Sequence, residues 1–307
     1  MLAAAFLDVL LPIIVVVGSG YAVRRAMPLD LRSLNRLSMY VLSPALIFTT
    51  LVRLSVAGDQ AVRIAVTSIA VIAAMGVITL LLGRLLRIER AGLAALLLCT
   101  MFMNAGNYGL PTARFAFGDA GLERALLFFL PQTLLSQVLA IAIATSGHGA
   151  TWRASFRQVL RMPQIYAAMA GLVALFLGVR IDTSPPALAG VLRGIALISD
   201  ATLPLLLLLL GMQLAQGVDL VDPRMTGLAA VLRLVVSPLV ALGIARSLGL
   251  DDVAWRVVVL QAGMPCAVNM ALYALEFDAR PRFVAGTVAL TTLISPLTLT
   301  LALTLLR

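Results

Sequence analysis

The sequence is dominated by apolar stretches of about 20 residues, the length at which a helix crosses the hydrocarbon core of a bilayer. The chain of 307 residues is 61% hydrophobic and 12% charged, whereas a soluble domain is about half apolar and about a quarter charged. We therefore expect an all-α polytopic membrane protein with ten transmembrane helices. The ten stretches lie at about 3–23, 33–53, 62–86, 91–115, 122–146, 163–180, 187–214, 225–248, 253–276 and 282–306.

The two halves of the chain resemble each other weakly. Pro44 in the second stretch and Pro204 in the seventh lie in similar segments, as do Asp119 after the fourth and Asp278 after the ninth, at offsets of 160 and 159 residues. Five spans is an odd number, so two such repeats have opposite orientations in the membrane, a recurring plan among transporters. We expect a first five-span repeat at 1–146, a cytoplasmic linker loop at 147–162 and a second repeat at 163–307.

All 23 basic residues are arginines, and most lie near the ends of apolar stretches. This placement favours membrane anchoring over nucleic-acid binding. Thirteen arginines fall on one side of the predicted topology and nine on the other. The positive-inside rule makes the side with thirteen cytoplasmic. Both termini are then expected to face outward.

Several classes of enzyme and metal site are excluded by what the sequence lacks. There is no lysine for Schiff-base chemistry, and His148 is the only histidine, so a multi-histidine metal site is excluded. No G-x-x-x-x-G-K-[ST] phosphate-binding loop is present. Cys99 and Cys266 both lie in apolar stretches and do not suggest a disulfide framework. We expect neither enzymatic activity nor a cofactor.

The fourth apolar stretch contains residues that interrupt helices. Glycine is flexible, proline lacks a donor, and asparagine competes for backbone groups. Unpaired backbone at membrane depth is tolerated only where protein or a water-filled cavity surrounds it. An interrupted hydrophobic segment is typical of a transporter's binding site. The candidate substrate-binding residues here are Asn104, Gly106, Asn107, Tyr108, Gly109 and Pro111.

The ninth stretch holds a counterpart to this segment. Two interrupted helices that meet in the membrane each present the first amides of their second half, which carry partial positive charge and attract an anion. Asparagine side chains add hydrogen-bond donors without a buried charge. The alternative is that these residues are packing glycines and kinks, which are common in membrane spans. The candidate residues of the ninth stretch are Gly263, Met264, Pro265, Cys266 and Asn269.

The segment Asn104-Ala-Gly106-Asn107-Tyr-Gly109-Leu-Pro111 resembles the Asn-x-Gly-x-x-Gly-x-Pro signature of the auxin efflux carrier family. Met264-Pro265-Cys-Ala-Val-Asn269 resembles the second broken-helix motif of that family, and Thr202-Leu-Pro204-Leu with Gly211 resembles its seventh-span pattern. The resemblance covers essentially the whole chain. The long cytoplasmic loop of the plant carriers is missing, which favours a bacterial-type member, located in the inner membrane with both termini periplasmic.

The resemblance implies broken helices four and nine that cross, with Asn104 contacting a substrate carboxylate. It also implies a scaffold of spans 1, 2, 6 and 7, which forms a homodimer, and a moving transport domain of spans 3–5 and 8–10. The implied function is secondary active transport of a small organic anion, either auxin-like or a mono- or dicarboxylate. One alternative is a sodium-coupled carrier of the bile-acid symporter type, and another is a membrane sensor that binds a ligand without moving it.

Two further charged residues lie inside apolar stretches. Asp200 in the seventh is a possible proton carrier, although pairing with Arg193 or a position near the interface is the favoured interpretation. Arg233 in the eighth is a candidate counter-ion for a carboxylate substrate or partner of an acidic side chain, and snorkelling toward a headgroup is the alternative.

Overall fold

The computed structural model describes residues 6–144, 162–179, 186–215, 217 and 220–306. Within these ranges the chain is helical, with one isolated β-bridge and no strand. Five of the described helices are long and apolar enough to cross a membrane, at Phe6–Ala26, Gly58–Leu85, Pro186–Leu214, Pro223–Ser247 and Pro281–Leu306. These observations confirm the prediction of an all-α membrane protein. The predicted linker at 147–162 lies outside the described residues except for Met162.

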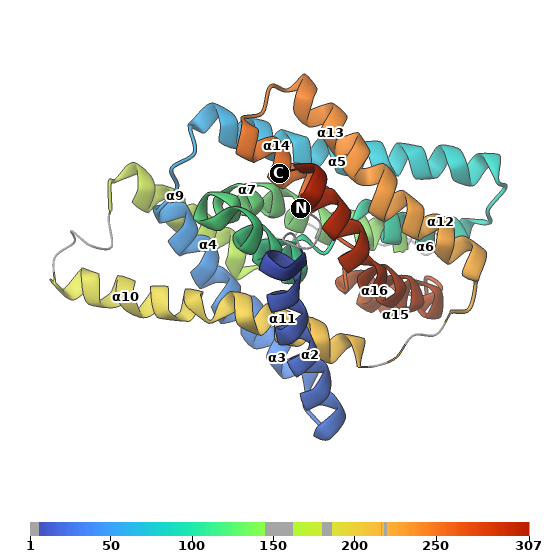
Figure 1. Ribbon diagram of the computed structural model, residues 1–307, viewed down its shortest axis with the longest axis horizontal. Helices are drawn as coiled ribbons and strands as arrows, with labels where there is room; N and C mark the ends of the chain where they lie inside the picture. Colours follow the sequence, from blue (N-terminus) through green and yellow to red (C-terminus); the bar gives the residue numbers. More distant parts are fainter. Residues whose placement is uncertain (1–5, 145–161, 180–185, 216, 218–219, 307) are drawn as a thin grey trace. The chain divides into compact units, whose positions relative to one another are not determined.

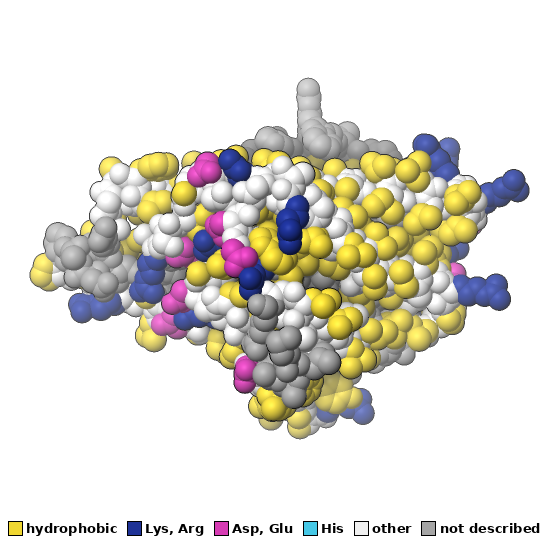
Figure 2. Space-filling model, turned by 45° about the horizontal axis from the view of Figure 1, so that its top comes forward, with side chains coloured by type: hydrophobic (Ala, Val, Ile, Leu, Met, Phe, Trp, Pro, Cys, Tyr) yellow, Lys and Arg dark blue, Asp and Glu magenta, His cyan; other side chains and the backbone are white. Residues whose placement is uncertain are grey.

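The surface supports the same conclusion. Large hydrophobic side chains are exposed along several helices, including Leu81 in the third apolar stretch and Leu297 in the tenth. Figure 2 shows a broad apolar expanse on one face, with arginine side chains projecting at its edge. Exposed apolar area on this scale is unfavourable in water and is expected where side chains meet lipid.

The chain forms two compact units. Unit 1 comprises Met1–Leu10, Ala57–Val159 and Gly217–Arg307, and unit 2 comprises Leu11–Val56 and Leu160–Gln216. Each unit therefore contains segments from both halves of the sequence.

Unit 2 is built around the packing of α2 against α11. Gly20 of α2 lies against the backbone of Leu208, and Gly211 of α11 lies against the backbone of Val17. Small residues allow such close approach between membrane helices. The helices of unit 2 are α2 (Leu11–Ala26), α3 (Leu31–Leu37), η2 (Ser38–Leu42), α4 (Ser43–Val52), α9 (Pro163–Phe176), α10 (Pro186–Asp200) and α11 (Thr202–Leu214).

Unit 2 also has buried polar contacts between its two sequence segments. The Thr49 and Ser199 hydroxyls lie 2.7 Å apart, and the Thr202 hydroxyl donates to the carbonyl oxygen of Leu42 at 3.0 Å. These bonds join η2 and α4 to α10 and α11. Such contacts satisfy groups that would otherwise be unpaired in an apolar interior.

Unit 1 contains the other helices, and in Figure 1 α5 and α13 run side by side within it. Its helices α6, η3, α7, α14, α15 and α16 contain or surround both interrupted segments. The described helices of unit 1 are η1 (Phe6–Leu10), α5 (Gly58–Leu85), α6 (Arg90–Met101), η3 (Ala105–Gly109), α7 (Leu110–Ala144), α12 (Pro223–Val231), η4 (Leu232–Val236), α13 (Ser237–Ser247), α14 (Asp252–Ala262), α15 (Asn269–Glu276) and α16 (Pro281–Leu306).

The boundary between the predicted fourth and fifth stretches, 115–122, contains a kink. Helix α7 (Leu110–Ala144) consists of two helical segments that meet at Gly118, which is not helical, with φ +65° and ψ −153°. Glycine adopts this left-handed conformation without a steric penalty.

At the start of α14, an ion pair joins distant parts of unit 1. The Asp251 carboxylate accepts from the backbone amide of Ala254 at 2.7 Å and pairs with Arg124 of α7 at 3.1 Å. Partial burial raises the pKa of Asp251, but the Arg124 guanidinium and the helix amides outweigh it, and the pKa is lowered from 3.8.

Candidate functional site

The first interruption separates α6 from η3. Helix α6 ends at Met101, and Phe102 is extended, with φ −111° and ψ 119°. Asn104, with φ −78° and ψ 54°, lies just before η3, whose five residues are in π-helical conformation. Its carbonyl oxygen accepts from the amide of Gly109 at 3.0 Å. The helix therefore unwinds for about one turn and restarts with a new set of free amides.

The second interruption separates α14 from α15. Helix α14 ends at Ala262, and helical structure resumes at Asn269. Gly263 is the C-cap, and its amide donates to the carbonyl oxygens of Val259 and Leu260 at 3.0 and 3.1 Å. Pro265 follows, and it has no amide with which to continue the helix.

The two interruptions pair with each other. Met103 and Cys266 form an antiparallel bridge. The amide of Asn104 donates to the carbonyl oxygen of Pro265 at 2.8 Å, and the amide of Ala267 donates to that of Phe102 at 3.0 Å. We call this paired region, residues 102–104 and 263–268, the crossover. Because its unwound backbone is hydrogen-bonded across the pair, it can be accommodated at membrane depth.

Neighbouring helices complete the crossover. The Gln132 side chain of α7 donates to the carbonyl oxygen of Met103 at 2.6 Å, and the Thr291 hydroxyl of α16 accepts from the amide of Cys266 at 3.2 Å. Sequence reasoning missed both residues. The signal for Gln132 was a polar side chain directly after Pro131 in an apolar run.

Several buried polar atoms around the crossover have no hydrogen-bond partner among the described residues. They include Nδ2 of Asn104, Oε1 of Gln132 and both side-chain polar atoms of Gln261. These three residues are at most 5% exposed. Unsatisfied buried polar groups are few in native proteins and are expected where a ligand or water completes them.

Glycines in η3 bring neighbouring side chains close to the backbone. A Cβ at Gly109 would lie 2.0 Å from Oε1 of Gln261, and one at Gly106 would lie 2.9 Å from Phe129. The glycine at 109 therefore allows the Gln261 amide to lie directly against the restarted helix. This contact also was not predicted.

The predicted site residues differ in their accessibility. Gly106 and Asn107 are partly exposed and Asn269 is exposed. These three residues flank the crossover in sequence, and we call them its accessible rim. The other nominated residues of the two segments are buried: Asn104, Tyr108, Gly109, Pro111, Gly263, Met264, Pro265 and Cys266. All of them lie in unit 1.

Arg233 is also in unit 1 and is fully buried. Its guanidinium donates to the carbonyl oxygen of Thr100 at 2.7 Å and to that of Ala262 at 2.5 Å, and it also donates to the Ser237 hydroxyl. These contacts place Arg233 beside the crossover, a position that the sequence did not predict. Snorkelling is excluded, because the side chain is enclosed by protein.

Asp200 lies in unit 2, at the last residue of α10, and is exposed. It does not form the ion pair with Arg193 that the sequence favoured. It also lies near the middle of the 29-residue apolar segment Pro186–Leu214 rather than at its end.

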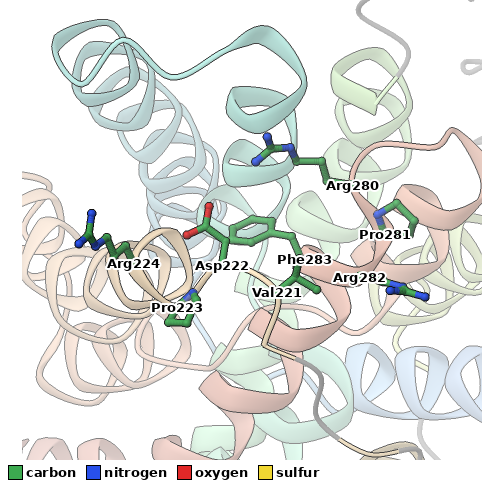
Figure 3. A pocket seen from close by; sticks show the side chains of 8 residues that line it. All are labelled: Val221, Asp222, Pro223, Arg224, Arg280, Pro281, Arg282 and Phe283. Carbon is green, nitrogen blue, oxygen red and sulfur yellow. The ribbon is translucent and has the colours of Figure 1, made fainter.

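A separate pocket of about 770 Å³ lies in unit 1, between the starts of α12 and α16. Arg224, Arg280 and Arg282 line it together with Asp222. Figure 3 shows Arg224 and Arg282 extending toward opposite sides of the view, and Arg280 pairs with Glu89. The arginines do not converge on a common point, and no crossover residue lines the pocket.

The family model described as membrane transport protein matches residues 5–303. The chain belongs to this family. It includes the auxin efflux carriers, so the resemblance noted in the sequence is confirmed, and its members are transporters rather than enzymes. This member of the family is an integral membrane protein.

Relatives of this membrane transport protein include archaeal and plant proteins. An uncharacterized transporter of Methanothermobacter thermautotrophicus is 29% identical over 298 residues, covering 96% of each chain. An uncharacterized transporter of Methanocaldococcus jannaschii is 22% identical, covering 87% of each. Auxin efflux carrier component 1 of Arabidopsis thaliana is 28% identical over 147 residues, which is 47% of this chain and 23% of the plant protein.

Proposed function

We propose that this protein is a secondary active transporter that moves a small organic anion, either auxin-like or a mono- or dicarboxylate, and binds it at the crossover. The observation that carries this proposal is the pairing of two interrupted helices beside buried polar groups that have no partner in the described part of the chain. The names of the plant relatives state auxin efflux, which supports a substrate with a carboxylate.

The preference for an anion follows from the charge at the crossover. The first amides of η3 and α15 carry the partial positive charge of a helix start, about half an elementary charge for a full helix. Asn104 adds the unpartnered Nδ2, and Asn107 and Asn269 lie at the accessible rim. Residues 102–104 and 263–268 contain no aspartate or glutamate that would repel an anion.

Transport would proceed by elevator-type alternating access, in which unit 1 carries the substrate across the membrane. Both interrupted helices belong to unit 1, so that unit could move without dividing the site. Unit 2 would be the scaffold and would form a homodimer. The proposed topology is ten spans in two inverted five-span repeats, in a bacterial inner membrane with both termini periplasmic.

The test is Asn104→Ala, compared with Asn35→Ala in α3 of unit 2 as a matched control. A panel of mono- and dicarboxylates is first screened by thermal shift on the wild type. We expect the best ligand to bind Asn104→Ala about 10- to 100-fold more weakly, the loss of one hydrogen bond to a charged group. Asn35→Ala should bind like the wild type.

Counterflow of the labelled ligand in proteoliposomes then separates transport from binding. A transporter exchanges internal for external ligand, and a sensor that only binds shows no exchange. Unchanged affinity and counterflow in Asn104→Ala would remove this residue from the mechanism.

A further inference from the structure

Arg233 is a buried charge with no acidic partner among the residues that the structure describes. It lies in η4, within the apolar segment Pro223–Ser247, and is 0% exposed. None of the ion pairs formed within the described residues includes it. A buried guanidinium is strongly unfavourable unless other groups replace its hydration. The groups that do so here are carbonyl and hydroxyl oxygens.

These oxygens lie at the ends of the two half-helices. Thr100 is in the last turn of α6, and Ala262 is the last residue of α14. Their carbonyl oxygens accept from Nη1 and Nη2 of Arg233 at 2.7 and 2.5 Å. The final carbonyls of a helix have no partner in the helix itself. A single side chain therefore caps both half-helices.

The charge of the guanidinium is also complementary to the partial charges of the two helix ends. Each helix C-terminus carries about half a negative charge, so two together carry about one, which one guanidinium neutralises. Ser237 supplies a further acceptor, and the Met103 sulfur lies 4.0 Å from Nη2. All these groups belong to unit 1.

In transporters built from broken helices, the C-terminal carbonyls of the half-helices can coordinate a sodium ion. Here the corresponding oxygens are occupied by a cation that is part of the chain. Arginine remains protonated under all ordinary conditions and cannot dissociate. A dissolved ion is therefore not needed to hold the two C-termini together.

We propose that Arg233 is a built-in cation that fills the place of a monovalent coupling ion at the crossover. The stability of unit 1 and binding of the substrate then require no sodium or potassium. The claim about substrate binding rests on the proposed function, whereas the claim about the stability of unit 1 does not involve a substrate.

The first test uses the wild-type protein in nanodiscs without ligand. Its Tm is measured in sodium, potassium and choline chloride at equal ionic strength. We expect the same Tm in all three salts, because Arg233 already occupies the carbonyl oxygens at the C-terminal ends of both half-helices. A saturable rise in Tm specific to sodium or potassium would overturn the proposal.

The second test removes the side chain with Arg233→Gly. We expect a lower Tm that recovers saturably with low millimolar guanidinium, sodium or potassium, since each can occupy the vacated oxygen cage. Arg233→Met fills the space with an apolar chain and should not recover. Arg246→Gly is the matched control, because Arg246 is exposed on α13, and it should not respond to guanidinium.

If Arg233→Gly is destabilised but recovers with none of these cations, the proposal is wrong. If Arg233→Gly does not fold, the comparison of the wild-type Tm in the three salts still tests the proposal. These measurements contain no substrate, so their failure is distinguishable from failure of the proposed function. A ligand whose binding to the wild type is unchanged when choline replaces sodium supports the proposal, and sodium-dependent binding contradicts it.

Discussion

Gly20 sets the distance between α2 and α11 in unit 2. A Cβ added at this position would lie 2.2 Å from the carbonyl oxygen of Leu208, whereas real Cβ contacts are essentially never shorter than 3.0 Å, so the two backbones must separate by about 0.8 Å. A backbone carbonyl cannot rotate away as a side chain does. Overpacking typically costs about 1–3 kcal/mol, and we expect Gly20→Ala to be at the upper end of that range.

Gly18 is the matched control, two residues earlier on the same helix. A Cβ there meets no atom within 4 Å, and alanine is favoured over glycine within a helix by about 0.5–1 kcal/mol. Gly18→Ala should therefore be neutral or stabilising. At about 2–4 °C per kcal/mol, the two variants should differ in Tm by roughly 5 °C or more in nanodiscs. Equal Tm values would refute the close helix packing described for unit 2.

Two further predictions concern polar contacts. The pKa of Asp251 is lowered in the folded protein, so its stabilising contribution is present above the ordinary value of 3.8 and is lost as pH falls through the lower folded pKa. Asp251→Asn should be less stable at neutral pH and lose less stability than the wild type in an acid titration of Tm. In unit 2, the Thr49–Ser199 hydrogen bond should show a coupling energy of about 0.6 kcal/mol in a double-mutant cycle with Thr49→Val and Ser199→Ala; additive effects would contradict it.

The helices and their interruptions were predictable from local sequence. Apolar length indicated helices, five of which are long enough to cross a membrane, and Pro265 marked the unwound segment after α14, because proline acts on its own backbone. The first interruption, at residues 102–104, lies just before the glycines that predicted it, and Gly106 itself is in η3. The partners across the crossover were not predictable. The contact of Gln261 with Gly109 and the capping by Arg233 join residues far apart in sequence, and their side chains alone do not specify which backbone groups they meet.

At the crossover, most backbone acceptors are hydrogen-bonded, whereas several donors are not. Its backbone acceptors are largely used: the carbonyls of Phe102, Met103 and Pro265 accept from protein donors. Donors remain, including Nδ2 of Asn104 and the first amides of η3, which have no partner in a preceding turn. Apart from the side-chain oxygens Oε1 of Gln132 and Oε1 of Gln261, a metal cation would find few free oxygens here, whereas a carboxylate would find free donors and partial positive charge. Arg233 occupies two further acceptors, the carbonyl oxygens of Thr100 and Ala262 at the ends of α6 and α14. Removing that side chain would free them for a cation, so it should weaken discrimination between anions and cations as well as stability.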